Sequence, residues 1–364
     1  MSDPDAIVSP QSITPIFDLT GAQLWPILEA AIEGERIREV RIAIERQVEG
    51  YFGGCGDKLI PTIAYTTHSG LSGEITLFVK RFSWKGCSEA IHYRHLAERG
   101  TPAPRLYGTL MSPDQEEILF LEYLPSIGMD KRSVEDWRTL LTLIARFAAA
   151  PLSAEYQVLL PTSELSSYLR SEDTKADIVV CLDRAKQGEL GADLAAFCQD
   201  SEALTTRVLE RVGRLNRQIE QMPVGLIHQD FLPDNLGWRG ERQEMLVFDI
   251  HKNALGPRFY DLTRWFGKTI LTIGPSSWLD GSEGLRQELT EHFLQEYARW
   301  GGAVVTVADF QEEIRLLSLA SSVEMLWWLR DRAHDGLVEW KNDPEEARKE
   351  TRAHLLRLLH QLAD

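Results

Sequence analysis

The sequence predicts an α+β protein in which a small antiparallel β-sheet precedes a larger, mainly helical region. Three β-rich segments follow one another near the N-terminus, separated by turn sequences. From Val134 onward, helical spacing of apolar residues dominates. The chain has 364 residues, and a single hydrophobic core rarely serves more than roughly 250–300 residues. Two domains are therefore expected, with a cleft between them as the place for a ligand.

Composition restricts the class of protein and its partners. Hydrophobic residues make up 43% and charged residues 26%, as in ordinary globular proteins. No apolar run approaches the roughly 20 residues of a membrane span, and the acidic start lacks the pattern of a signal peptide. A net charge of −16 disfavours nucleic acid and anionic membrane surfaces as partners. We therefore expect a cytoplasmic protein whose charge suits a cationic ligand, although solubility explains that charge equally well.

The four cysteines are Cys55, Cys87, Cys181 and Cys198, which lie far apart and form no CxxC pair. We expect free thiols in a reducing compartment and no disulfide bond.

The N-terminal elements alternate between helix and strand patterns. Residues 20–34 have helical apolar spacing behind a possible N-cap at Thr20. Three β-rich runs follow at hairpin spacing and predict an antiparallel sheet: residues 40–48, 59–68 and 75–82. Helical spacing resumes at Ser88 and stops at Gly100.

The later elements begin with an apolar strand at 118–124, followed by a Pro–Ser–Ile–Gly stretch typical of a hinge. Helices are expected at 134–150 and 194–222, and again from about residue 250 to the C-terminus. A short β-rich segment, 224–250, separates them.

The segment 228–235, His-Gln-Asp-Phe-Leu-Pro-Asp-Asn, carries the strongest chemical signal. Asp230 and Asn235 lie five residues apart on one predicted loop, where a carboxylate can orient or deprotonate a hydroxyl and an amide oxygen can bind a hard cation. Asp249 ends a strand-like run fourteen residues later, a position that suits magnesium. A plain turn with a buried histidine and a capping aspartate is the alternative. The ordered set of glycine turn, strand lysine, helix glutamate, hinge, loop and strand aspartate favours catalysis.

These motifs resemble the aminoglycoside phosphotransferase and choline kinase family, the small-molecule relatives of protein kinases. The loop 228–235 is similar to that family's HGDxxPxN, including Pro233. Residues 248–262 resemble its Asp-x₆-Gly-Pro-x-x-Tyr-Asp-Leu segment, and the similarity spans about residues 38–265. The resemblance implies a protein-kinase-like two-lobe fold with lobes 1–124 and 125–364. It also implies ATP and Mg²⁺ as cofactors and a hydroxyl of a small molecule as the acceptor.

The resemblance implies a role for each matching residue. Asp230 would be the catalytic base, and Asn235 with Asp249 would hold magnesium. Lys80 would hold the α- and β-phosphates as a point charge at the end of a strand. The alternative for Lys80 is a solubilising lysine at a sheet edge.

Further residues would complete the nucleotide site. Glu89 would pair with Lys80, although Glu98 lies on the same predicted helix. Backbone groups of Glu122 and Leu124 would bind adenine at the hinge. Backbone amides of a glycine turn would approach the phosphates, although a plain β-turn is an equal alternative; its glycines are Gly53, Gly54 and Gly56.

His228 and Asp261 are expected to support the loop 228–235, and two features of the sequence depart from the pattern of protein kinases. His228 is expected to brace the loop, and Asp261 to accept hydrogen bonds from its backbone. Gln229 replaces both the arginine of regulated protein kinases and the glycine usual in the resembled family. Only 12 residues separate Asp249 from Asp261, too few for an activation loop with a peptide-docking segment. Peptide phosphorylation is therefore disfavoured.

The helices from about residue 270 are expected to bind the acceptor. Glu324, Trp327, Trp328 and Asp331 lie at helical spacing, and aromatic faces beside carboxylates hold ammonium groups. This favours an aminoglycoside-like or amino-alcohol substrate. Alternatively, the tryptophans pack in the core and the acids form a solvated face, which leaves a neutral sugar or macrolide-type alcohol open.

Two further classes compete with a kinase. A nucleotide-binding pseudokinase should lack at least one of Lys80, Asp230, Asn235 and Asp249, and all four are present. If the chain were a metal-dependent phosphoesterase, the glycine turn, the strand lysine and the hinge would have no role. The sequence leaves the acceptor and the oligomeric state open.

Overall fold

The computed structural model of the chain describes residues 7–48, 57–82, 88–112, 114–130, 132–149, 151–266, 283–336 and 343–364. Two compact units make up the chain. The first contains Met1–Met129 with Leu232–Lys252, and the second contains Asp130–Phe231 with Asn253–Asp364.

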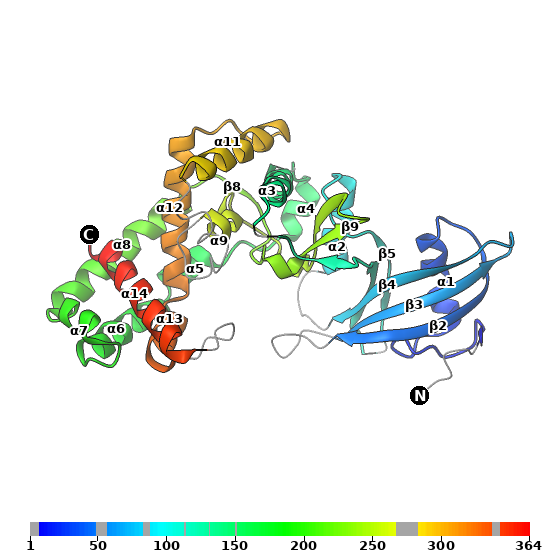
Figure 1. Cartoon of the computed structure of the whole chain (residues 1–364), viewed down its shortest axis with the longest axis horizontal. Helices are drawn as coiled ribbons and strands as arrows, with labels where there is room; N and C mark the ends of the chain where they lie inside the picture. The colour runs from blue at the N-terminus through cyan, green and yellow to red at the C-terminus, as the bar shows by residue number, and fades with distance from the viewer. Residues whose placement is uncertain are drawn as a thin grey trace. The chain divides into compact units, whose positions relative to one another are not determined.

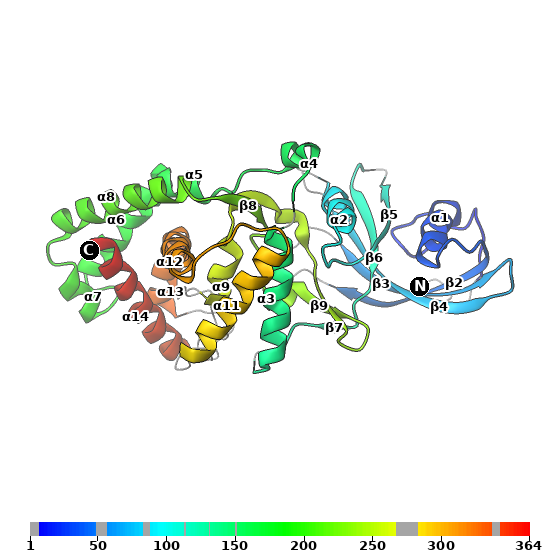
Figure 2. The same cartoon turned by 90° about the horizontal axis from the view of Figure 1, so that it is seen from above.

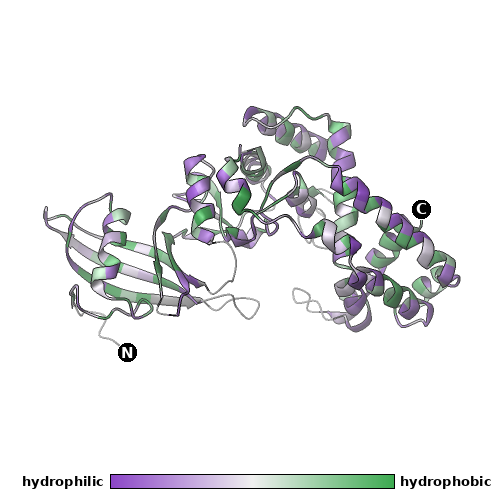
Figure 3. Cartoon of the chain, turned by 180° about the vertical axis from the view of Figure 1, so that it is seen from behind, coloured by the Kyte–Doolittle hydropathy of each residue, from purple (hydrophilic) through white to green (hydrophobic). Residues whose placement is uncertain are grey.

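The first unit is built on an antiparallel six-stranded sheet with the strand order β1-β2-β3-β4-β6-β5 (Figure 1). Its strands are β1 (Ile7–Val8), β2 (Ile37–Val48), β3 (Lys58–Thr67), β4 (Ser72–Phe82), β5 (Leu106–Met111) and β6 (Glu117–Glu122). Hydrophobic and hydrophilic residues alternate along these strands (Figure 3), because successive side chains point to opposite faces of a sheet. The predicted antiparallel sheet is present, with three more strands (β1, β5 and β6) than the three successive runs indicated.

Helix α1 (Gly21–Ala31) covers one face of this sheet. Thr20 begins it with a capping box, as its hydroxyl accepts from the backbone of Gln23 and the Gln23 side chain accepts from the backbone of Thr20. Leu24 and Leu28 are buried in the core that α1 shares with the sheet. The expected N-cap at Thr20 is confirmed.

Helix α2 (Glu89–Glu98) covers the opposite face. On β4, Val79 belongs to the core beneath α1, so the next residue, Lys80, points to the other face. There its side chain meets Glu89 at the start of α2. The strand period and the position of one helix thus bring an ammonium group and a carboxylate together.

A second sheet of the first unit differs from the expected division of the chain at residue 124. It has the order β10-β9-β7, formed by Glu244–Val247, Leu236–Arg239 and Ser126–Ile127. Pairing of β9 with β7, together with a hydrogen bond from Trp238 Nε1 to the carbonyl of Gly128 (2.9 Å), holds the two segments together. Residues 125–129 and 232–252 therefore fold with the N-terminal unit, although we expected them in the helical lobe.

The second unit is mainly helical. Its helices are α3 (Val134–Ala149), α4 (Ala154–Leu159), α5 (Leu165–Arg170), α6 (Glu172–Lys186), α7 (Ala192–Phe197), α8 (Ser201–Glu220), α9 (Thr263–Phe266), α11 (Glu283–Arg299), α12 (Val307–Glu324), α13 (Leu326–Asp335) and α14 (Pro344–Ala363). Figure 2 shows α6, α7, α8 and α14 gathered together, in agreement with their packing contacts. The helix expected over 194–222 is divided in two, because Asp200 takes a non-helical conformation before α8.

A two-stranded sheet lies within this helical unit. Strand β8 (Val224–Ile227) pairs antiparallel with β11 (Ala254–Pro257), and β8 leads directly into the loop that begins at His228. Among the residues that the structure describes, no helix is both long and apolar enough to cross a membrane.

Candidate active site

Lys80 is the centre of a buried ionic cluster in the first unit. Its Nζ donates to Glu89 Oε2 at 2.8 Å and to Asp249 Oδ1 at 2.6 Å. The side chains of Lys80 and Glu89 are 4% and 0% exposed. Glu98, the alternative partner, lies exposed at the other end of α2. The predicted contact between Lys80 and Glu89 is therefore present, and Lys80 is not a solubilising edge residue.

The cluster keeps both kinds of group charged. Burial alone would lower the pKa of Lys80, but the negative charges of Glu89 and Asp249 outweigh it and raise the pKa above its ordinary value. Burial alone would raise the pKa of Asp249, but the contact with His251 and the charge of Lys80 hold the pKa well below its usual range. The ion pairs are thus stable at neutral pH.

Asp249 is held by contacts on several sides. Its Oδ1 accepts from Lys80 and lies 3.0 Å from His251 Nδ1, which leaves Oδ2 outside both contacts. Tyr93, fully buried on α2, hydrogen-bonds the backbone of Asp249. Burial raises the pKa of Tyr93 well above its ordinary value, so the phenol stays neutral. The sequence-based assignment missed Tyr93 and His251. For His251, its position two residues after Asp249 could have suggested this contact, whereas no sequence pattern suggested that of Tyr93.

Asn235 and Asp249 lie at the same end of one hairpin. Strands β9 and β10 pair Leu236 with Val247, so the residues just outside this pair also lie together. The backbone carbonyl of Asn235 accepts from the amide of Phe248 at 3.0 Å. An amide and a carboxylate so placed form a set of hard oxygen donors that suits Mg²⁺. Asp249 already binds one cation, the Lys80 ammonium, so these residues fit the group that the sequence predicts.

The predicted hinge is anchored within the first unit. The Glu122 carboxylate binds the Arg239 guanidinium through two contacts of 2.7 Å. Burial alone would raise the pKa of Glu122, but hydrogen bonds from Arg239 lower it. A Cβ atom at Gly237 would lie 2.6 Å from the Leu124 side chain, so a larger residue there would require Leu124 to move. Arg239, which the sequence analysis missed, fixes the strand end whose backbone is predicted to bind adenine.

The first residues of the loop 228–235 belong to the second unit. The backbone N–H groups of His228 and Gln229 donate to the Asp261 carboxylate at 2.7 and 2.9 Å. The Asp230 amide donates to His228 Nδ1 at 3.2 Å, and His228 packs against Phe147. The predicted hydrogen bonds from the loop backbone to Asp261 are present. Burial raises the pKa of Asp261 to about 6, against the opposing effect of these two donors.

Arg264 and Trp265 hold the same loop from the short helix α9. Arg264 Nη2 donates to the Gln229 carbonyl at 3.1 Å, and Nη1 lies 3.8 Å from Asp230 Oδ1. Trp265 Nε1 donates to the carbonyl of Phe231 at 3.0 Å. Both residues lie within three positions after the Tyr-Asp-Leu segment, but no spacing rule in the sequence indicated their contacts.

Gln229 of the second unit and Asp249 of the first both have left-handed backbone conformations, with φ +65° and +59° respectively. Such conformations cost a non-glycine residue about 1–3 kcal/mol and cluster at functional sites. The left-handed φ explains why glycine is usual at the position of Gln229 in the resembled family, because glycine adopts this region without strain.

The residues expected to bind the acceptor do not share one helix. Helix α12 ends at Glu324, and Met325 (φ −94°, ψ 10°) separates it from α13, where the two tryptophans lie. The continuous helical spacing that we expected is therefore wrong. Trp327 is 44% exposed, whereas Trp328 is 8% exposed and packs in the core. Glu324 is largely buried and accepts from Tyr260 Oη at 3.1 Å; burial raises the pKa of Glu324.

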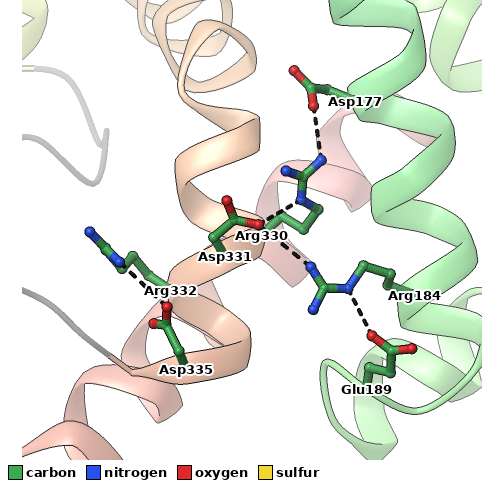
Figure 4. A network of polar contacts seen from close by, with 7 residues as sticks. All are labelled: Asp177, Arg184, Glu189, Arg330, Asp331, Arg332 and Asp335. Carbon is green, nitrogen blue, oxygen red and sulfur yellow. Dashed lines mark hydrogen bonds and ion pairs between the residues drawn. The ribbon is translucent and has the colours of Figure 1, made fainter.

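Asp331 belongs to a network of ion pairs (Figure 4). Arg330 Nε lies 2.9 Å and Arg184 Nη1 3.5 Å from its Oδ1. Arg330 also binds Asp177 at 2.8 Å, and Arg184 binds Glu189 at 2.8 Å. The charge of Asp331 is therefore already neutralised by arginines.

The glycine turn and two of the four cysteines lie outside the described residues, whereas the other two cysteines lie within them. The residues outside are Gly53, Gly54, Gly56, Cys55 and Cys87. Cys181 and Cys198 are buried free thiols, which agrees with the expected absence of disulfide bonds for these two cysteines.

Comparisons with known proteins agree with this geometry. Residues 88–310, more than half of the chain, match the model of the phosphotransferase enzyme family. No curated protein matches the sequence.

Solved structures resemble most of the chain at low sequence identity. A choline kinase from Cryptosporidium parvum Iowa II has a TM-score of 0.51 and 10% identity, covering 88% of this chain and 90% of that chain. Spectinomycin phosphotransferase APH(9)-Ia, in complex with ADP and spectinomycin, has a TM-score of 0.49 and 14% identity, covering 96% and 98%. An ethanolamine kinase from Plasmodium vivax has a TM-score of 0.46 and 12% identity, covering 89% and 84%. The choline kinase match, with the sheet and helices described above, confirms the protein-kinase-like α+β fold.

Proposed function

Because the chain belongs to the phosphotransferase enzyme family and is a small-molecule kinase, we propose that it transfers the γ-phosphoryl group of ATP, with Mg²⁺, to a hydroxyl of an amine-bearing small molecule. The acceptor oxygen attacks the γ-phosphorus, the bond to the β–γ bridging oxygen breaks, and the hydroxyl proton passes to Asp230.

The observation that carries this proposal is the buried Lys80 cluster. A lysine that is 4% exposed between two carboxylates is a poor device for stability, because desolvation offsets most of the attraction. The same arrangement presents a fixed positive charge of the kind that phosphoryl transfer requires. Asn235 and Asp249 would hold Mg²⁺, whose charge offsets that of the phosphate oxygens. The two residues are oxygen donors at one hairpin end, and this supports the assignment.

Asp230 is the proposed base. The residues around it bind the loop backbone, which supports a role for them in positioning Asp230 rather than in proton transfer. The Asp261 carboxylate and Arg264 together bind backbone groups on both sides of the Gln229 peptide. His228 accepts from the Asp230 amide. Because these contacts fix the backbone at residues 229 and 230, the base loses little conformational freedom when an acceptor binds. Correct orientation contributes much of the rate in such transfers.

The preference for an amine-bearing acceptor depends on Glu324 and Trp327. A largely buried carboxylate with a raised pKa gains from a neighbouring ammonium group, and the exposed face of Trp327 can contact a cation. The arginines around Asp331 and the burial of Trp328 favour the second candidate, a neutral sugar or macrolide-type alcohol.

The test is a coupled ADP-release screen over aminoglycosides, amino alcohols, sugars and macrolides, with and without Mg²⁺. We expect Mg²⁺-dependent ADP release that requires an amine-bearing alcohol. Turnover of neutral alcohols alone would contradict the acceptor class and leave the kinase intact. If no hydroxyl compound stimulates ADP release, the chain would instead be a nucleotide-binding module.

A further inference from the structure

Three residues with metal-ligating side chains lie together in the first unit. Glu89 comes from the start of α2, and Asp249 and His251 come from the segment after β10. One ligand atom of each lies within 4.8 Å of the others. The set contains two carboxylates and one imidazole, and therefore differs from the all-oxygen pair of Asn235 and Asp249.

A second, independent observation comes from the Glu89 carboxylate. Glu89 is 0% exposed, its Oε2 binds Lys80, and its Oε1 has no hydrogen-bond partner. A buried carboxylate oxygen without a partner is costly, and such an atom in a native structure requires an explanation. Because Oε2 of the same carboxylate binds the Lys80 ammonium, the group faces the space where a cation is held. A metal ion would satisfy the unpaired oxygen.

We propose that Glu89, Asp249 and His251 form a binding site for Zn²⁺ that competes with the Lys80 ammonium. Imidazole suits zinc and other borderline metals, whereas Mg²⁺ prefers an octahedral set of oxygens and water. Zinc takes nitrogen and carboxylate ligands at about 2.0–2.2 Å, so its ligand atoms lie roughly 3.4 Å apart in a tetrahedral site. His251 Nδ1 and Asp249 Oδ1 lie 3.0 Å apart, and one ligand atom of each of the three residues lies within 4.8 Å of the others, so small side-chain movements would complete this spacing. A water molecule would fill the fourth position.

Competition follows from the geometry. The two carboxylates that would bind zinc are the same two that hold Lys80, and two cations so close repel each other in a buried site. Zinc binding therefore displaces Lys80 from both partners. Because Asp249 would also serve the nucleotide-bound Mg²⁺, zinc and the ATP–Mg²⁺ complex exclude each other. Zinc would thus inhibit the enzyme at this site.

The primary experiment is calorimetric titration of the nucleotide-free protein with Zn²⁺ in reducing buffer. We expect one saturable site, which His251→Ala weakens at least about 10-fold, since loss of even an outer partner of a metal ligand costs roughly 10–100-fold. His68→Ala is the matched control, because His68 is an exposed histidine of the same unit. Equal binding by the wild type and His251→Ala would overturn the site.

Two further variants separate coordination from positioning and test the competition. His251→Asn can still donate a hydrogen bond to Asp249 but offers no imidazole nitrogen, so zinc should bind it as weakly as His251→Ala. Restored binding in His251→Asn would overturn direct coordination. Lys80→Met removes the competing cation, so its zinc affinity should rise at least about 10-fold and zinc should raise its Tm more than that of the wild type. Unchanged affinity in Lys80→Met would overturn the competition.

Nucleotide binding is measured in parallel in zinc-free buffer with ATP–Mg²⁺. Zinc binding without any ATP–Mg²⁺ binding would contradict the proposed function while the zinc site stands. ATP–Mg²⁺ binding that zinc does not inhibit would overturn the exclusion at Asp249 and leave the proposed function intact.

Discussion

Two clusters of ion pairs, one in each unit, show different uses of the same charges. In the first unit, one lysine with a side chain 4% exposed lies between Glu89 and Asp249. In the second unit, Arg330 and Arg184 share Asp331, whose side chain is 42% exposed (Figure 4). The lysine cluster leaves one buried carboxylate oxygen without a partner, whereas the arginines bind carboxylates that are 24–42% exposed. This difference supports the proposal that the first cluster serves a ligand, whereas the second is expected to contribute local stability.

The largest expected effect distinguishes the two cations. Lys80→Met leaves the buried Glu89 and the partly buried Asp249 without their shared counter-charge, so the free energy of unfolding should fall by about 3–5 kcal/mol. Arg330→Met, its counterpart in the partly exposed network, should lower it by no more than about 1 kcal/mol. Urea unfolding of both variants provides the measurement.

Activity should follow the same division. Lys80→Met should reduce kcat/KM for ATP by at least about 10²-fold, as for other removed charge-stabilising groups, whereas Arg330→Met should stay within about twofold. Comparable loss of activity in both variants would show that the clusters do not differ in function.

The second effect distinguishes two aspartates that each lie beside an arginine. Asp230→Asn should lower kcat at least about 10²-fold, the scale of a positioned acid–base group, with ATP affinity nearly unchanged. Asp331→Asn should leave kcat within about twofold because its carboxylate already binds arginines. Steady-state kinetics with the acceptor found in the screen gives both values. Near-normal turnover of Asp230→Asn would contradict its assignment as the base.

The third effect distinguishes the two neighbouring tryptophans of α13. Trp327 is partly exposed, so a cation–π contact there contributes about 0.5–1 kcal/mol, and Trp327→Ala should raise the acceptor KM roughly two- to fivefold. Trp328 is buried, so Trp328→Ala should lower stability by about 3–5 kcal/mol through packing alone. The acceptor KM, the ATP KM and Tm are measured for each variant. An unchanged acceptor KM in Trp327→Ala would favour a neutral acceptor.

The smallest effect concerns Gln229, whose backbone conformation is left-handed (φ +65°). Glycine adopts this region without strain, whereas a residue with a side chain does not. Gln229→Gly should relieve this strain and raise the free energy of unfolding by about 0.5–1 kcal/mol. Gln229→Ala, the control, keeps the strain and should bring no gain. A loss of stability in Gln229→Gly would show that this side chain contributes more than its conformation costs.

Local patterns carried much of the prediction. The capping box at Thr20 and the alternation in β2 to β4 depend on neighbours within a few residues, so they can be recognised along the chain. The loop 228–235 and the strand before Asp249 were recognised for the same reason. Their roles in catalysis and metal binding stay predictions, which the variants above test.

Contacts between distant residues required the folded chain. Glu89 rather than Glu98 meets Lys80 because only the start of α2 faces that strand. Asp331 meets Arg184 across 147 positions of sequence, and residues 232–252 join the N-terminal unit through pairing with β7. No periodicity or spacing along the chain encodes these contacts.

The linear sequence was therefore sufficient for the fold class, the order of the elements and the identity of the residues that carry charge, because these depend on short-range backbone preferences and on side-chain chemistry. The partner of each charged group, its burial and hence its pKa depended on packing between distant segments. That packing leaves Glu89 with an unpaired oxygen beside His251 and surrounds Asp331 with arginines. A carboxylate has the same chemistry at both places, and the surrounding dielectric and counter-charges decide what it can do.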